Sequence, residues 1–235
     1  MKIRLVTLML ALPLYGTGAL AADLSAPVDV VVPVAETPFT FAGAYFGAAV
    51  GYGWGSTSHE YVGGPGGGAP SGNSDPAGVL GGVYAGYNFQ WNSMVLGFEG
   101  DIEAADLNGS YTDKSGITST GSASMDWDAS IRARIGAAFG RSLLYATGGI
   151  AFAGYEFEGG PLPKPVCCGY SDTLTGWTVG AGWDFAIAPR WITRVEYRYT
   201  DYGSTSGKLK PAFPTTKMKT ENTTSVVRLG VAYKF

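Results

Sequence analysis

Apolar and polar side chains alternate along the stretch Asp126-Trp-Asp-Ala-Ser-Ile-Arg-Ala-Arg-Ile-Gly-Ala-Ala-Phe139. The odd-numbered positions carry Trp, Ala, Ile and Phe, whereas the even-numbered positions from 126 to 134 carry Asp, Ser and Arg. Successive side chains of a β-strand point to opposite faces of the sheet. The stretch therefore predicts a strand with one apolar face and one charged face.

Three further segments divide their side chains in the same way. Apolar residues alternate with acids in residues 94–104, with Arg and Glu in residues 191–202, and with Arg228 and a glycine in residues 223–235. This arrangement favours a strand whose apolar face meets lipid and whose charged face is enclosed. A soluble sandwich with an apolar core is the alternative, but it gives no reason for the aromatic residues at the strand ends.

The alternation does not decide which side chains of residues 143–157 point inward. In residues 143–157, Leu144 and Ile150 imply one register, while Tyr145 and Tyr155 imply another. We assign no facing to this strand.

A glycine followed three residues later by an aromatic residue recurs four times. The copies are Gly86/Phe89, Gly136/Phe139, Gly182/Phe185 and Gly230/Tyr233. The first three copies end close to the turn signals at 91–93, 140–142 and 188–190, and the fourth ends close to the last residue, Phe235. Such a period indicates repeated hairpin units. We expect the glycines to point inward and to leave space for long charged side chains.

Long polar and glycine-rich segments separate these units. We interpret residues 55–78, 105–123, 158–172 and 203–222 as loops. The expected strands are 44–54, 79–90, 94–104, 124–139, 143–157, 173–187, 191–202 and 223–235. Each reaches the roughly 9 to 11 residues that cross a bilayer when tilted. Their number and the alternation of long loops with short turns predict an all-β fold, an eight-stranded antiparallel transmembrane β-barrel with short periplasmic turns and long extracellular loops.

Aromatic residues gather where such a barrel would meet the two membrane interfaces. The expected belt beside the short turns consists of Phe89, Phe139, Phe185 and Tyr233. A second belt would contain Trp54, Trp127, Trp177 and Tyr199. Aromatic girdles of this kind are typical of outer-membrane barrels.

The inward faces combine acids and arginines. The expected lumen charge network comprises Glu99, Asp101, Glu103, Asp126, Asp128, Arg132, Arg134, Asp184, Arg194, Glu196, Arg198 and Arg228. Side chains just fill an eight-stranded barrel, so we expect a polar plug with Glu99 paired to Arg132 or Arg134, and Glu196 to Arg228. A proton or cation path, or a catalytic carboxylate pair, is the functional alternative.

The N-terminus has the pattern of an export signal. Lys2 and Arg4 precede an apolar core at 5–14 and a small-residue cleavage site ending at Ala21, so residues 1–21 are predicted to be a signal peptide. The Pro-rich residues 22–43 are expected to form an extended periplasmic leader, and residues 44–235 the outer-membrane β-barrel.

Several other functions are disfavoured. A net charge of -3 and a pI near 5.2 argue against a nucleic-acid partner. The chain has one histidine, His59, in a glycine-rich loop, so we expect neither a triad nor a metal site, and no cofactor. Cys167 and Cys168 could form a vicinal disulfide, a reactive thiol pair or two idle thiols, and we favour a loop feature without catalysis.

A family resemblance is carried by several stretches, which include Val83-Tyr-Ala-Gly-Tyr-Asn-Phe89, Ser130-Ile-Arg-Ala-Arg-Ile-Gly136, Arg194-Val-Glu-Tyr-Arg-Tyr199 and the ending Arg228-Leu-Gly-Val-Ala-Tyr-Lys-Phe235. They resemble the RopB-type outer-membrane proteins and porin-like surface antigens of alphaproteobacteria, within the OmpA-like transmembrane barrel superfamily. The likeness covers nearly all of the chain after the signal. It implies that Leu229, Val231, Tyr233 and Phe235 form the signal read by the barrel-assembly machinery.

The resemblance implies a location in the cell outer membrane, in contact with lipid and lipopolysaccharide. We therefore expect a non-enzymatic integral barrel that supports the envelope and meets host or surface ligands through its loops. A narrow porin-like diffusion channel is the alternative, and a membrane-embedded enzyme is a third hypothesis for which the sequence offers no site.

Overall fold

The computed structural model describes residues 39–62, 72–113, 119–161, 168–208 and 217–235. The predicted signal peptide and most of the predicted leader fall outside these ranges, so both stay predictions. In the described part of the chain, no helix is long and apolar enough to cross a membrane.

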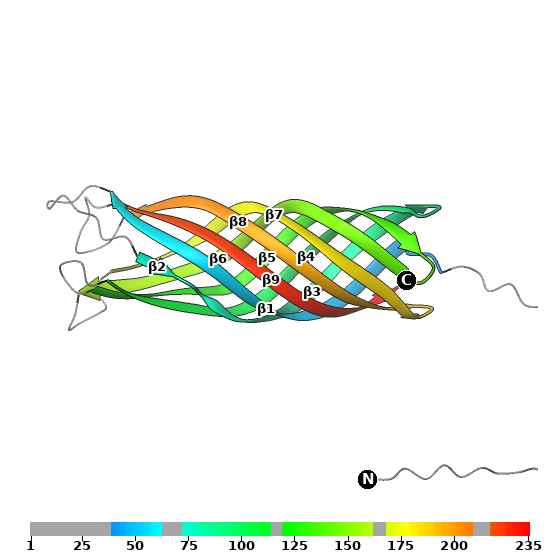
Figure 1. Ribbon diagram of the computed structural model, residues 1–235, viewed down its shortest axis with the longest axis horizontal. Helices are drawn as coiled ribbons and strands as arrows, with labels where there is room; N and C mark the ends of the chain where they lie inside the picture. Colours follow the sequence, from blue (N-terminus) through cyan, green and yellow to red (C-terminus); the bar gives the residue numbers. More distant parts are fainter. Residues whose placement is uncertain (1–38, 63–71, 114–118, 162–167, 209–216) are drawn as a thin grey trace, which may run out of the picture. The chain divides into compact units, whose positions relative to one another are not determined.

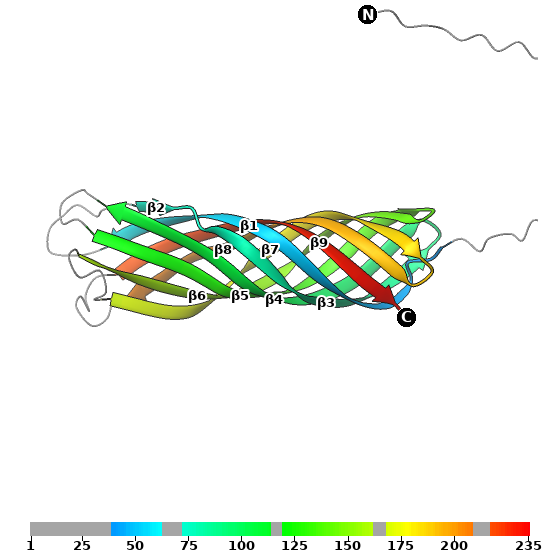
Figure 2. The same ribbon diagram turned by 90° about the horizontal axis from the view of Figure 1, so that it is seen from below.

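The described residues form nine antiparallel β-strands. These are β1 (Gly43–Val62), β2 (Gly72–Ser74), β3 (Ala77–Trp91), β4 (Met94–Asp113), β5 (Ser119–Phe139), β6 (Ser142–Pro161), β7 (Cys168–Ala188), β8 (Trp191–Lys208) and β9 (Lys217–Lys234). Each of β3 to β8 pairs with the next strand along the chain, and β1 pairs with both β3 and β9. The β1–β9 ladder closes the sheet into the tilted barrel of Figures 1 and 2.

The barrel wall has eight strand positions. β2 and β3 occupy one of them, because both pair with β1 and only Asp75 and Pro76 separate them. Proline has no backbone N–H, so it interrupts a ladder where it occurs within a strand. The predicted all-β, eight-stranded antiparallel barrel is therefore confirmed.

The strands extend far beyond their predicted ends. All four segments that we interpret as loops (55–78, 105–123, 158–172 and 203–222) contain residues of strands. That part of the prediction is wrong, because the Ser, Thr and Gly residues there lack apolar alternation and yet pair in continuous ladders. Backbone hydrogen bonds do not require one apolar face, so the wall continues past the part that lipid covers.

The three short turns lie at one end of the barrel. Asn92-Ser93 joins β3 to β4, Gly140-Arg141 joins β5 to β6, and Pro189-Arg190 joins β7 to β8. Asn92 and Gly140 have positive φ angles of 52° and 59°, which two-residue hairpins often require and which these residue types tolerate. In Figure 1 the hairpins lie at the same end as the C-terminus.

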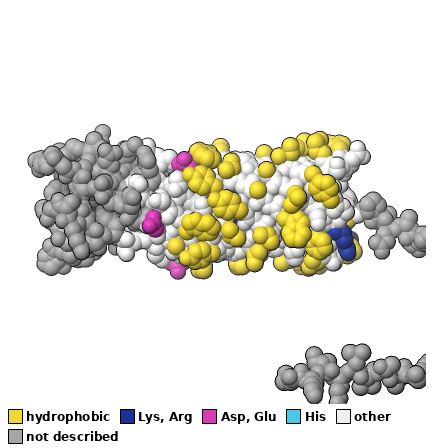
Figure 3. Space-filling model, viewed as in Figure 1, with side chains coloured by type: hydrophobic (Ala, Val, Ile, Leu, Met, Phe, Trp, Pro, Cys, Tyr) yellow, Lys and Arg dark blue, Asp and Glu magenta, His cyan; other side chains and the backbone are white. Residues whose placement is uncertain are grey.

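The two faces of the wall differ sharply. Arg132 is 1% exposed, whereas the neighbouring Ile131 is 69% exposed. Figure 3 shows the outward hydrophobic side chains as a broad yellow band, with acidic side chains at one margin and basic ones at the other. A charged interior within an apolar outer surface is the reverse of a soluble protein and suits a barrel embedded in lipid.

The structure settles the facing of β6, which the sequence leaves open. Tyr145 and Tyr155 are buried in the barrel, while Leu144 and Ile150 are more than half exposed on its outside. All four positions fit one register, since the two sets belong to opposite faces.

Candidate functional site

Five strands bring charged side chains together inside the barrel. β4 contributes Glu99, Asp101 and Glu103 at every second position, and β5, β7, β8 and β9 face them with arginines and further acids. Eleven of the twelve residues of the expected network are buried: Glu99, Asp101, Glu103, Asp128, Arg132, Arg134, Asp184, Arg194, Glu196, Arg198 and Arg228. We call these eleven side chains the lumen network.

Arg132 lies at the centre of the lumen network. Its Nη2 is 2.6 Å from Glu99 Oε1 and 2.9 Å from Asp101 Oδ2, and its Nη1 is 2.6 Å from Glu196 Oε1. Glu99 and Arg132 are also direct partners in the β4–β5 ladder. One guanidinium thus joins carboxylates of two strands, β4 and β8, that are not neighbours in the wall.

Arg228 ties β9 into the same centre. Its Nη2 is 2.7 Å from Glu196 Oε1, and its Nη1 is 2.9 Å from Glu103 Oε1. Glu196 and Arg228 stand opposite each other in the β8–β9 ladder. The structure thus contains both pairs expected from the sequence, Glu99 with Arg132 and Glu196 with Arg228.

Tyrosine rings complete the network on the side of the short turns. Arg134 and Arg194 both bond Asp184, the latter with Nε 2.9 Å from Asp184 Oδ1. Arg134 Cζ lies 3.6 Å from the centre of the Tyr145 ring, and Arg194 Cζ lies 4.3 Å from that of Tyr84. These cation–π contacts help to hold the arginines away from water.

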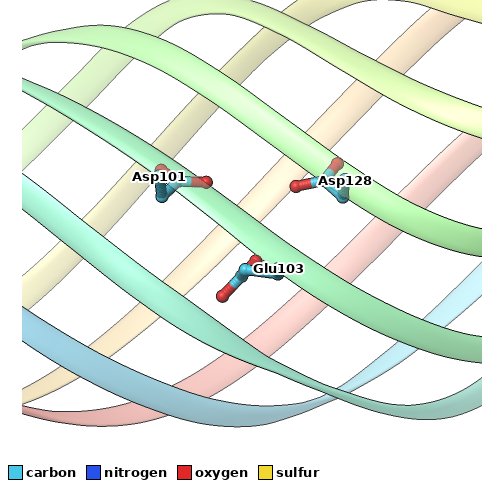
Figure 4. Close-up of side chains that lie close together, drawn as sticks. All are labelled: Asp101, Glu103 and Asp128. Carbon is cyan, nitrogen blue, oxygen red and sulfur yellow. The ribbon is translucent and has the colours of Figure 1, made fainter.

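Three carboxylates approach one another on the opposite side of the network. One oxygen each of Asp101, Glu103 and Asp128 lies within 4.8 Å of the other two. Figure 4 shows the three side chains inside the barrel. Arg198 faces this cluster, with nitrogen–oxygen distances of 2.9, 2.8 and 2.6 Å to the three residues respectively. Tyr202 also donates its hydroxyl proton to Asp128. The positive charge that the cluster requires comes from arginine.

Asp126 is the exception among the expected network residues. In the β5–β6 ladder Met125 pairs with Tyr155 and Trp127 with Gly154, which leaves Asp126 without a partner in a β-bulge. The bulge shifts the alternation by one residue, so Asp126 is exposed while Asp128 is buried. The assignment of Asp126 to the lumen is therefore wrong.

Apolar clusters lie above and below the network. Near the short turns, Phe41, Val95, Leu143 and Ile192 pack with buried tyrosines and alanines, and toward the opposite end Leu80, Leu107 and Val226 form a second cluster. Phe41 falls in the segment expected to be a leader, yet it is 1% exposed and its N–H donates to Gln90 Oε1 over 2.7 Å. Both ends of the ionic interior are thus covered by packed side chains.

The inward glycines leave room for tyrosines rather than for charged side chains, which corrects our expectation. A Cβ on Gly86 or Gly182 would collide with the hydroxyl of Tyr45 or Tyr145 respectively. Tyr45 in turn donates a 2.7 Å hydrogen bond to Glu99 Oε2. The recurring glycines are therefore the sequence signal that could have predicted inward-pointing tyrosine rings beside them.

Substitution of Gly86 tests this packing. In Gly86→Ala we expect the free energy of unfolding to fall by about 1 to 3 kcal/mol, because the new methyl group would collide with Tyr45 and lie 2.6 Å from the Phe98 carbonyl oxygen. The matched control is Gly100→Ala on the outer face, where a Cβ meets only Ser130 O at 3.7 Å. Urea unfolding of the refolded barrel measures both, and equal midpoints would contradict the close approach.

The expected belt beside the turns lies on the outer surface. Phe89, Phe139 and Phe185 are exposed, and Tyr233 is half-buried with its ring 5.3 Å from that of Phe235. The segment expected to be an assembly signal consists of Leu229, Val231 and Tyr233, on the outer face of β9, and of Phe235, which directly follows this strand. At the other interface Trp54, Trp127 and Trp177 are also exposed.

Three positions of interest escape this description. Cys167 lies outside the described residues, and nothing is described of the Cys168 side chain, so the hypotheses about this pair stay untested. The same holds for the side chain of His59.

Comparison with known proteins agrees with this architecture. The family model for the outer membrane protein beta-barrel domain matches residues 7–235. The chain is 32% identical to the 31 kDa outer-membrane immunogenic protein of Brucella melitensis, over 94% of this chain and 95% of that relative. It is 31% identical to the 25 kDa outer-membrane immunogenic protein of Brucella abortus, over 98% and 97%.

Two further likenesses extend the comparison. The 22 kDa outer membrane protein of Rhizobium leguminosarum is 31% identical over 67% of each chain. The crystal structure of the outer membrane protein OprG from Pseudomonas aeruginosa superimposes with a TM-score of 0.55, at 12% identity, over 83% of this chain and 96% of that one. At this low identity, the likeness to OprG shows a similar fold and nothing about function.

Proposed function

The chain belongs to the outer membrane protein β-barrel family, and from this premise we propose that it is a non-enzymatic structural protein that supports the envelope and meets its surroundings at its outward end. One observation carries the proposal: the lumen network, in which five arginines and six acids fill the barrel. Eight of these eleven charged residues are at most 2% exposed: Glu99, Glu103, Arg132, Arg134, Asp184, Glu196, Arg198 and Arg228. A barrel whose lumen is packed in this way serves as a membrane-spanning structural element rather than as a channel.

The apolar outer surface of the barrel and the end opposite the short turns indicate which partners we expect. The apolar band between the belts would contact the acyl chains of membrane lipid and lipopolysaccharide. The assembly signal on β9 would be read by the barrel-assembly machinery, and Phe235, 74% exposed at the end of that strand, is accessible for it. Surface or host ligands would bind at the end opposite the short turns, and the immunogenic relatives support exposure of that end.

Planar-bilayer recording tests the sealed interior. We expect purified, refolded protein to give no discrete and reproducible current steps, because an ion would have to displace arginine–carboxylate pairs that are buried in the lumen. Heat-modifiable migration on a gel would show that the protein used in the recordings was folded. Regular openings of one size from the wild-type protein would contradict the proposal and favour the alternative, a narrow diffusion channel.

A further inference from the structure

Within the described residues, the ladder between β7 and β8 stops short of the outward end of the barrel. β7 pairs with β8 only as far as Trp177 and Asp201, and in the described strands β7 residues 168–176 have no ladder partner on that side. Those residues do pair with β6 on their other side, from Gly159–Cys168 to Phe152–Thr175. Beyond Trp177, therefore, one long edge of β7 faces a gap.

A bend in β8 creates this gap. Gly203 has a φ of +64°, and the β8–β9 register shifts between Asp201 and Ser204. The Gly203 N–H donates to Asp201 Oδ1 over 2.7 Å, which fixes the bend. At its base the strands still touch, since a Cβ on Gly176 would lie 2.6 Å from Tyr202 Cα. β7 and β8 therefore separate next to their last shared pair, Trp177 and Asp201, on the side away from the short turns.

The opened edge carries backbone groups of known direction. Thr173 donates its N–H to Asp172 Oδ1 over 2.8 Å, so this amide is satisfied by a side chain instead of by a neighbouring strand. Because peptide groups alternate in direction along a strand, Ser171 and Thr175 present their N–H and C=O groups to the same side. An edge of this kind is a template for a further strand.

A second interruption lies between β3 and β4 and is less open. The β3–β4 ladder ends at Ala77–Asn108, because the preceding residue is Pro76, which has no N–H to donate. Beyond it β2 contacts the outer part of β4. The β7 edge is thus the better candidate.

The surroundings of the β7 edge are acidic. Asp126, Glu156 and Asp172 line a hollow of about 350 Å³ on β5, β6 and β7, together with Trp127. All three carboxylates belong to exposed residues. Asp201 adds a fourth acid at the base of the gap. These charges favour a partner with cationic side chains.

We propose that the β7 edge from Cys168 to Gly176 binds an extended polypeptide segment rich in Lys or Arg, which adds to the wall as an extra strand. Backbone hydrogen bonds to Ser171 and Thr175 would supply affinity, and the cationic side chains would be attracted by Asp172 and Asp201 at the edge and by Glu156 and Asp126 one and two strands away. This deepens the proposed surface role and rests on it, because the edge meets such a segment only if this end lies outside the membrane.

A synthetic peptide is the probe. We would measure fluorescence anisotropy of a dye-labelled peptide that alternates Lys with Val, titrated with the refolded full chain in detergent micelles. Two further peptides carry N-methyl groups on the Lys amides or on the Val amides, and a fourth replaces Lys by Glu. We expect the unmodified Lys peptide to bind, one N-methylated peptide to bind at least about tenfold more weakly, and the Glu peptide not to bind.

Variants of the edge complete the test. Ser171→Pro removes one gap-facing N–H and should weaken binding by about threefold to tenfold, whereas Ser171→Ala retains that N–H and should bind as the wild type does. Thr175→Pro serves as the second variant if Ser171→Pro fails to give the heat-modifiable folded form. Failure of the Lys peptide to bind overturns the inference, and so do equal affinities for all three Lys peptides. A barrel that is sealed in bilayer recordings but ignores the peptide leaves the structural role intact and removes only this binding site.

Discussion

Replacement of Arg228 by alanine should lower the free energy of unfolding of the barrel by about 3 to 5 kcal/mol. Arg228 is 1% exposed and lies within hydrogen-bonding distance of both Glu196 and Glu103. The substitution leaves these two carboxylates with one cation fewer in a space that water does not reach. Removing one partner of a buried ion pair is costly for this reason, even where the intact pair contributes little net stability.

Urea titration in detergent, followed by tryptophan fluorescence, would measure the loss. Arg141→Ala is the matched control, since Arg141 lies exposed in the β5–β6 turn and its removal changes the net charge equally. We expect that control to stay within about 0.5 kcal/mol of the wild type. Adding Glu103→Gln to Arg228→Ala should restore part of the stability, because it removes one of the two carboxylates that have lost Arg228 as a partner. Equal midpoints for wild type and Arg228→Ala would show that the network does not bear on stability.

The charged lining could be predicted because period-two alternation is a local property of the chain. Ile131 and Arg132 are adjacent, so whichever face one takes, the other takes the opposite. That rule placed the arginines of β5, β8 and β9 on one side before any contact was known. One further step was needed to place that side in the lumen: in a membrane barrel the apolar face points outward to lipid, whereas in a soluble protein it points inward.

The rule fails where the backbone departs from regular pairing. Asp126 lies one residue before Trp127 in a bulge, and a bulge depends on the register of two neighbouring strands rather than on the residues of one. The ends of the strands were missed for a related reason. Residues 108–113 show no apolar alternation, so their pairing depends on the strands beside them and leaves no periodic signal.

The inward tyrosines show a third kind of limit. Tyr45 and Tyr84 are buried against Glu99 and Arg194, although large aromatic rings are expected on the lipid-facing side. What permits them is the absence of a side chain on an adjacent strand, as at Gly86 beside Tyr45. Such a pair can be recognised only once the register between the two strands is fixed, and a single sequence does not contain that register.

Replacement of Ile131 by arginine should lower the free energy of unfolding in lipid by about 2 to 4 kcal/mol. Ile131 is 69% exposed on the outer face of β5, between the belt residues Trp127 and Phe139. A cation at that depth must lie in hydrocarbon or draw water and headgroups toward it. Met94→Arg is the matched control, because Met94 is also exposed but adjoins a short turn, where the expected cost is about 0 to 1 kcal/mol.

The expected effect of Ile131→Arg on stability has opposite consequences in a water-soluble protein and in a membrane barrel. In a water-soluble protein, an exposed isoleucine exchanged for arginine changes stability little and improves solubility. In a membrane barrel the same exchange is harmful, and the harm depends on depth. Unfolding from vesicles should therefore rank Ile131→Arg below Met94→Arg, and Met94→Arg close to the wild type. If the two variants were equally stable, the apolar band would not be the surface that faces the acyl chains.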